Sequence, residues 1–441
     1  MSRVLLRNAR TLSGEQVDVR IIDGVIDEVA AAGSLSAQDA PESSGQTHDL
    51  SGFLVLPSLV EPHTHLDKTL TIDRAPNPAG DLDGAIEAWL RERALLTEED
   101  VYRRAQTTLV RALGNGVTVL RTHVDTAADT DLAAVRALLQ LRREYHGVMD
   151  VQVIAGHGLP ASGPDALPHT KMLLDALELG VDGIGGAPSL DENPSAALDR
   201  LAAIASDARL PLDLHVDETT DPEVFVLPQL IDLADRFDHR VTVGHIVSLA
   251  AQREQVQRDV SRRLAAAGIT VVTLPQSNLY LQGRPGAGAA ARGAGAGPAR
   301  GLTALDALAE AGVTVAAGAD NIADPFNPMG RADPLETASL LVTAGHRPVE
   351  SALGAVTDAA RRAVDSPIVA LAPGSDADLL AVRADDLTDL VGRAPQERIV
   401  YRRGRVVSRT QVSRWVTPNP GDAPTNAAPT SRTLSTIGNE R

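Results

Sequence analysis

Four histidines and two acidic residues are spaced so that they could hold a metal ion and move protons. Two of the histidines stand in an H-x-H pair, and alternate side chains of a strand point to the same side, so both can grip one ion. Imidazole nitrogens together with a carboxylate suit Zn²⁺ or Fe²⁺ and leave a position open for water. The residues are His63, His65, His215, Glu218, His245 and Asp320.

The elements that must position these residues follow a repeated strand–helix pattern. From Gly52 onward, apolar strands alternate with segments of helical spacing, including one at 85–116, which is typical of βα units and a parallel sheet. Eight units close a (β/α)8 barrel, whose active sites lie at the carboxyl ends of the strands. We predict strands at 59–66, 117–125, 150–158, 181–189, 210–218, 240–248, 269–277 and 313–321.

Position within this pattern strengthens the metal hypothesis. An isolated H-x-H is weak evidence, because surface and core histidines are common. The chain has only 11 histidines, however, and four of them fall at or near the ends of three predicted strands, with Asp320 at the end of a fourth. A chance structural arrangement is therefore the weaker interpretation.

The two ends of the chain are predicted to form a second, smaller unit. Residues 1–58 show short strands and turns, with Asp23-Gly24 as a hairpin turn, and residues 366–413 have the same character. We therefore expect an α/β protein, with a (β/α)8 barrel at 59–365 and a small β-sandwich domain formed from both chain ends.

Two segments lack the composition of packed elements. Residues 414–441 are rich in Pro, Thr, Ser, Asn and Ala and are predicted to be a disordered tail. The Gly/Ala-rich stretch 283–301 follows the seventh strand on the active face of the barrel, where it could serve as a lid.

Composition excludes several classes of protein. A chain of 441 residues with 43% hydrophobic content can bury a large core. The net charge of −17, without a basic stretch, argues against nucleic acid as a partner. The absence of cysteine removes disulfides, iron–sulfur clusters and thiol nucleophiles, so a metal must sit on histidine and carboxylate.

Membrane association is not expected either. No apolar run approaches the ~18 residues of a membrane span. The opening MSRVLLRNARTL is too short for the apolar region of a signal peptide. We therefore expect a cytoplasmic protein; whether it is a homo-oligomer stays open.

Several segments carry a family resemblance that spans most of the chain. Together they resemble the amidohydrolase superfamily, and within it bacterial cytosine deaminases and relatives that act on aminotriazines. The resemblance implies metal binding by His63, His65, His215 and Asp320. It also implies a single ion, because the carboxylated strand-four lysine that bridges two metals in other members has no counterpart in VDGIGGAPS. The segments are PSLVEPHTHLDK, RTHVD, LDLHVDE, VTVGH, NLYLQGR and GADNIADPF.

Around the substrate, the sequence departs from the cytosine deaminase pattern. Gly156-His157-Gly158 replaces a loop with a ring-reading glutamine, Asn321 replaces a second aspartate, and Phe326 stands where a tryptophan is usual, whereas Asp324 is retained. Cytosine is therefore expected to be a poor substrate. We expect substrate contacts from Lys68, Leu82, His157, Gly158, Gln282, Asn321 and Phe326.

Lys68 is one of only two lysines in the chain. A compact ammonium group beside the H-x-H pair could contact a substrate carbonyl. A salt bridge with Asp67 or a neighbouring acid is an equally open interpretation.

The expected reaction is hydrolytic deamination of a small amino-substituted nitrogen heterocycle. A divalent cation lowers the pKa of bound water toward about 7. Glu218 would shuttle a proton to the ring nitrogen, and Asp320 would accept the remaining proton from the attacking water. His245 would hydrogen-bond the developing oxyanion.

Two other hypotheses stay open. The same site could cleave a cyclic amide or remove an N-alkylamino group, which the products would distinguish. A metal-binding homologue without turnover is a different class, but it would need neither Glu218 nor His245.

Overall fold

The computed structural model describes residues 2–35, 45–156, 160–163, 166–234, 237, 239–282 and 301–413. The chain divides into a unit at Met1–Thr410 and a second at Gln411–Arg441. The predicted tail and residues 283–300 of the predicted lid lie outside the described residues.

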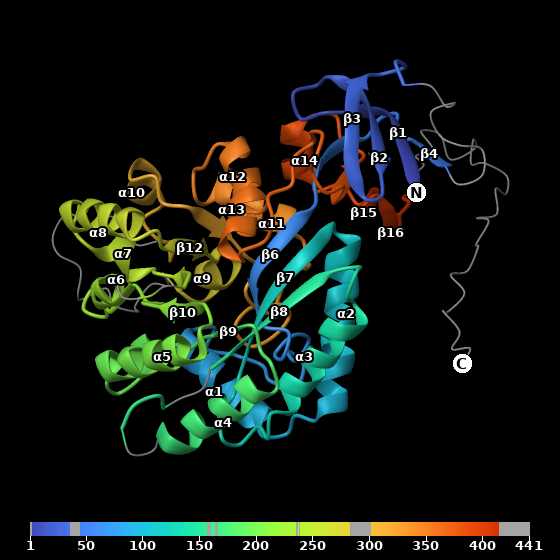
Figure 1. The fold of residues 1–441 in the computed structure, drawn as a ribbon. Coiled ribbons are helices and arrows are strands. Elements are labelled where there is room, and N and C mark those ends of the chain that lie inside the picture. Colours follow the sequence, from blue (N-terminus) through green and yellow to red (C-terminus); the bar gives the residue numbers. More distant parts are fainter. Residues whose placement is uncertain are drawn as a thin grey trace, which may run out of the picture. The chain divides into compact units, whose positions relative to one another are not determined.

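Eight parallel strands form the wall of the barrel (Figure 1). Each strand pairs with the next one along the chain, as predicted. The strands are β6 (Leu59–Thr64), β7 (Val117–Val124), β8 (Asp150–Ala155), β9 (Gly183–Ile184), β10 (Leu212–Val216), β11 (Val241–His245), β12 (Thr270–Thr273) and β13 (Val315–Ala317).

The first and last strands meet at their carboxyl ends. The backbone N–H of Asp320 donates to the carbonyl of His63 at 2.9 Å, and the N–H of His65 donates to the carbonyl of Asp320 at 3.2 Å. Thr64 and Asp320 form a parallel bridge there. The (β/α)8 barrel expected from the sequence is confirmed.

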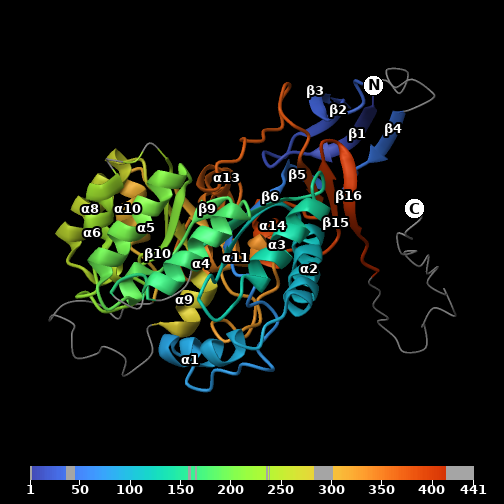
Figure 2. The ribbon, with the colours of Figure 1, turned by 60° about the horizontal axis from the view of Figure 1, so that its bottom comes forward.

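Helices alternate with the strands and cover the outside of the wall; Figure 2 shows α4, α5, α6 and α8 along it. The helices are α1 (Leu82–Arg93), α2 (Glu98–Gly114), α3 (Ala133–Glu144), α4 (Ala166–Glu178), α5 (Pro194–Ala208), α6 (Leu227–Ala234), α7 (Ser248–Ala251), α8 (Glu254–Ala266), α9 (Pro275–Leu281), α10 (Leu305–Glu310), α11 (Pro334–Thr343), α12 (Val349–Ala355) and α13 (Asp358–Ala363). Among the described residues, none of the helices combines the length and apolarity of a membrane span.

The helical segment predicted at 85–116 is in fact two helices, α1 and α2. Thr97 stands in an extended conformation before α2, and its hydroxyl accepts a hydrogen bond from the N–H of Asp100 at 3.2 Å. This N-cap, followed by acidic residues that complement the helix dipole, starts a new helix. The break matters for the site, because it lets α1 take its own direction at the mouth of the barrel.

A second sheet takes strands from both chain ends, which confirms the expected β domain. Its order is β16-β15-β14-β5-β1-β2-β3, with β4 on β1. The hairpin turn at Asp23-Gly24 is present, with φ of 50° and 88°. The elements are β1 (Arg3–Arg10), β2 (Gln16–Ile22), β3 (Val25–Ala31), β4 (Gly45–Asp49), β5 (Leu54–Pro57), β14 (Leu379–Val382), β15 (Arg398–Arg402) and β16 (Arg405–Thr410), with α14 (Leu387–Arg393) between β14 and β15.

Candidate active site

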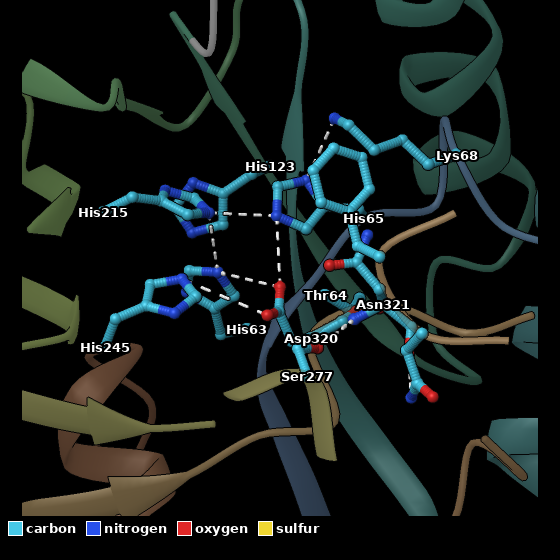
Figure 3. Close-up of polar contacts among 12 residues, drawn as sticks. His63, Thr64, His65, Lys68, His123, His215, His245, Ser277, Asp320 and Asn321 are labelled. Carbon is cyan, nitrogen blue, oxygen red and sulfur yellow. Dashed lines mark hydrogen bonds and ion pairs between the residues drawn. The ribbon is translucent and has the colours of Figure 1, made fainter. Parts of the chain in front are cut away.

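The candidate metal-binding residues converge at the carboxyl ends of the barrel strands (Figure 3). His63 lies in β6, His215 in β10 and His245 at the end of β11. His245 and Asp320 have φ of 68° and 62°. This left-handed backbone is unusual away from glycine and costs of order 1–3 kcal/mol, so the rest of the barrel must hold it.

Three imidazoles and a carboxylate point their polar atoms at one another. His215 Nε2 lies 3.0 Å from both His63 Nε2 and His65 Nε2. Asp320 Oδ1 lies 3.6 Å from His63 Nε2 and 3.3 Å from His65 Nε2. All four side chains are buried.

This donor set fits a divalent cation. A neutral imidazole nitrogen carries at most one proton, so His215 Nε2 cannot donate well to two other imidazole nitrogens at once. Atoms bound to one tetrahedral zinc at about 2.1 Å lie roughly 3.4 Å apart, close to the spacings observed. A cation at the centre would account for the convergence of the nitrogens.

The buried carboxyl group of Glu61, on β6, holds the backbone next to these candidate ligands in place. Glu61 Oε1 accepts hydrogen bonds from the N–H of His63 at 3.2 Å and from the N–H of Ala319 at 3.0 Å. Burial raises the pKa of Glu61 to about 8. One side chain therefore fixes the backbone of both β6, which carries the H-x-H pair, and the segment after β13 that leads to Asp320. The junction of these two segments, where the barrel closes, is called the seam.

His245 lies beside the same cluster. Its Nε2 is 4.0 Å from Asp320 Oδ2, and it belongs to a group of four potential ligands with His63, His215 and Asp320. Its Nδ1 lies 2.9 Å from Asn278 Nδ2.

Glu218 completes the polar end of the site. Its Oε1 lies 3.3 Å from His245 Nδ1 and accepts from Asn278 Nδ2 at 3.5 Å. Burial, reinforced by the nearby Asp320 carboxylate, raises the pKa of Glu218 well above its usual range. Burial also raises the pKa of Asp320, to about 7.

Lys68 is buried and ion-paired. Its Nζ lies 2.8 Å from Asp125 Oδ1 and 3.3 Å from Asp67 Oδ2. The salt-bridge interpretation is therefore realised, with a closer partner in Asp125 than in Asp67. Lys68 also lines the pocket, so the ion pairs do not remove it from reach of a ligand.

A pocket of about 170 Å³ opens onto these groups. It is lined by His65, Lys68, Leu82, Ile86, Trp89, Leu90, Arg93, Asp125, Ala187, Leu190, His215, Glu218, His245, Asp320, Asn321 and Phe326.

Most residues predicted to contact substrate lie in this lining, but not all. Gln282 is absent from it; its Nε2 donates to the backbone carbonyl of Glu218 at 2.9 Å. Gln282 thus contacts the site through the backbone of Glu218. His63, a candidate metal ligand, is fully buried and does not line the pocket. His157 and Gly158 lie outside the described residues.

Apart from Leu82, sequence reasoning missed the wall of the pocket that α1 supplies. Ile86, Trp89, Leu90 and Arg93 all come from α1, and Asp125 follows β7. A signal was present, since apolar residues recur on one face of α1 and Trp89 is one of only two tryptophans in the chain.

The barrel and its cluster of strand-end histidines and aspartate define an amidohydrolase. The model of the family described as "Amidohydrolase family" matches residues 79–408, and the chain belongs to this family. The chain is 32% identical over 404 residues to a pterin deaminase of Rhizobium rhizogenes, covering 90% of this chain and 88% of that protein.

Two solved structures extend the comparison. One is 5-methylcytosine deaminase from Klebsiella pneumoniae liganded with 5-fluorocytosine, with a TM-score of 0.81 and 28% identity over 94% of this chain and 99% of that one. The other is N-isopropylammelide isopropylaminohydrolase from Burkholderia multivorans, with a TM-score of 0.78 and 29% identity over 93% and 99%. The expected cytosine deaminase-like amidohydrolase is confirmed.

Proposed function

We propose that this amidohydrolase uses one divalent cation, zinc or iron, to deaminate a small amino-substituted nitrogen heterocycle. The observation that carries the proposal is the convergence of three imidazole nitrogens and a carboxylate oxygen beside Glu218 and His245. Relatives named as deaminases of pterin and 5-methylcytosine support the reaction class.

The cation would be held by His63, His65, His215 and Asp320. When bound, it would supply a water acidic enough to attack at neutral pH. Asp320 accepts a proton from the attacking water. Because its carboxylate is buried at the edge of the pocket, the proton stays near the ring instead of passing to solvent.

Glu218 protonates the ring nitrogen as the amino-bearing carbon is attacked. Its carboxyl lines the pocket, and its raised pKa favours the protonated form that can donate. The carboxylate formed then takes the proton from the new hydroxyl group, and Asp320 passes the proton that it accepted from water to the departing amine. The net change is water in, and a ring carbonyl and ammonia out.

His245 acts as a hydrogen-bond donor and not as a ligand. The amide nitrogen of Asn278 faces both His245 Nδ1 and Glu218 Oε1, two acceptors, at 2.9 and 3.5 Å. A neutral His245 that accepts at Nδ1 carries its proton on Nε2. That proton is on the side of Asp320, where the oxyanion develops.

Lys68 supplies a donor for a ring carbonyl. Two of its three N–H groups go to Asp125 and Asp67. The third is 3.3 Å from His65 Nδ1, but an imidazole that binds a cation through Nε2 carries its proton on Nδ1 and does not accept there. One ammonium proton is therefore left for substrate.

The pocket favours a ring larger than a pyrimidine. One water needs about 10–15 Å³ of such volume, so 170 Å³ accommodates on the order of ten or more water-sized groups. Phe326 and Leu82 supply apolar walls, and Asn321, whose Nδ2 donates to Asp324 at 2.8 Å, keeps a second N–H for the ligand. Cytosine would leave part of this space unfilled.

Removal of an N-alkylamino group is the second candidate reaction. It is favoured by the likeness to N-isopropylammelide isopropylaminohydrolase and needs the same site. The two reactions differ in the amine that leaves.

A screen of aminopyrimidines, aminotriazines and aminopteridines distinguishes these reactions. Ammonia release from an aminopteridine, with cytosine at least ~10-fold poorer in kcat/KM, is the expected result. Release of alkylamine alone would favour the second reaction. No turnover of any ring by metal-replete protein would overturn the proposed function.

A further inference from the structure

The Asp125 carboxylate holds in place the wall of the pocket that α1 supplies. Trp89 Nε1 donates to Asp125 Oδ2 at 2.7 Å. Arg93, four residues further along and so on the same helix face, places its NH1 3.4 Å from that oxygen. Two donors of α1 therefore hold the helix to the end of β7.

The other oxygen of Asp125 holds the ammonium group of the site. Lys68 Nζ lies 2.8 Å from Asp125 Oδ1 and 5.0 Å from the centroid of the Trp89 ring. That separation is within the range of a cation–π contact. The indole is thus fixed at its edge by Asp125 and at its face by Lys68, and it is only 3% exposed.

The wall continues along α1 in apolar residues. Leu82, Ile86 and Leu90 recur at every fourth position, the spacing of one helix face, and all three line the pocket with Trp89. An isolated six-membered ring held by Lys68 and Glu218 needs no wall of this length. A fused second ring or a large ring substituent would pack against this apolar wall of α1.

We infer that Trp89 is a specificity-determining residue, against whose indole the second ring of a fused amino heterocycle packs, and that Asp125 positions it. This inference rests on the proposed function and narrows its substrate to fused rings. A flat aromatic surface held from two sides gains the stacking energy without having to be ordered when the ligand binds.

The test compares kcat/KM for a fused aminopteridine and for cytosine in three variants. Trp89→Leu removes the aromatic surface. Trp89→Phe keeps a flat ring but loses the N–H to Asp125. Tyr145→Leu, outside the pocket lining, is the control for loss of a large aromatic residue.

Trp89→Leu is expected to lower kcat/KM for the fused ring at least about 10-fold more than for cytosine, chiefly through KM, the scale of losing a ring stack. Trp89→Phe should fall between Trp89→Leu and the native protein, and Tyr145→Leu should leave the preference unchanged. Equal losses for both substrates in Trp89→Leu would overturn the assignment.

A binding measurement tests the same contact without turnover. Because the chain has two tryptophans, Trp415→Phe leaves Trp89 as the sole indole. Titration with the dioxopteridine product should quench its fluorescence saturably, whereas uracil should quench it little. A product that inhibits turnover without quenching Trp89 would overturn the inference, and native protein inactive on every ring would instead overturn the proposed function.

Discussion

Lys68 forms its shortest ion pair with Asp125, at 2.8 Å, although Asp67 is its neighbour in the chain. Burial lowers the pKa of Lys68, but the Asp125 and Asp67 carboxylates outweigh it and raise that pKa above its ordinary value. The ammonium group is therefore charged at neutral pH. It offers a fixed positive donor to a ligand in the pocket.

Lys68→Met is expected to destabilise the protein by about 3–5 kcal/mol, because the buried Asp67 carboxylate loses its cation and Asp125 keeps only Arg93. Adding Asp125→Asn should restore part of that loss. The free energy of unfolding in urea, measured for both single variants and the double variant, gives the coupling. Additive effects would contradict a direct Lys68–Asp125 interaction.

Removal of metal with a chelator should abolish turnover, and one equivalent of Zn²⁺ or Fe²⁺ per chain should restore it. The thermal midpoint should rise with the added ion, because the ligands converge only in the folded state. Elemental analysis supplies the stoichiometry, and the absence of cysteine removes thiolates as competing ligands. Two tightly held equivalents would refute a mononuclear site.

Glu218→Gln should keep its metal but lose at least about 100-fold in kcat, since glutamine preserves the shape of the side chain but cannot exchange a proton. Metal content and kcat are measured on the same preparation. A metal-replete variant with near-native turnover would remove Glu218 from the proton pathway.

His245→Asn and His215→Asn form a matched pair that separates donor from ligand. If His245 donates from Nε2, its variant should retain stoichiometric metal and lose about 100-fold or more in kcat, the scale of removing an oxyanion donor. His215→Asn should instead lose its metal. Equal loss of metal from both variants would make His245 a ligand.

The barrel and the metal cluster were predictable because strand periodicity and the strand-end rule act together. Once His215 and Asp320 were assigned to strand ends, the fold brought them to the H-x-H pair. The α1 wall was not predictable in the same way, because Trp89 meets Asp125 across 36 positions, and only because α1 ends at Arg93 and a separate helix starts after Thr97. Such a meeting depends on helix direction, which periodicity does not encode.

The backbone hydrogen bond from Asp320 to His63 has a consequence for synthesis of the chain. A nascent chain that stops short of Asp320 already contains the other three proposed ligands, but the seam that brings them into register does not yet exist. We therefore expect the proposed ion to be bound after the barrel has closed, and not to guide that closure. A ribosome-stalled chain truncated before Asp320 should bind no stoichiometric metal, while its early strands are already available to pair with one another.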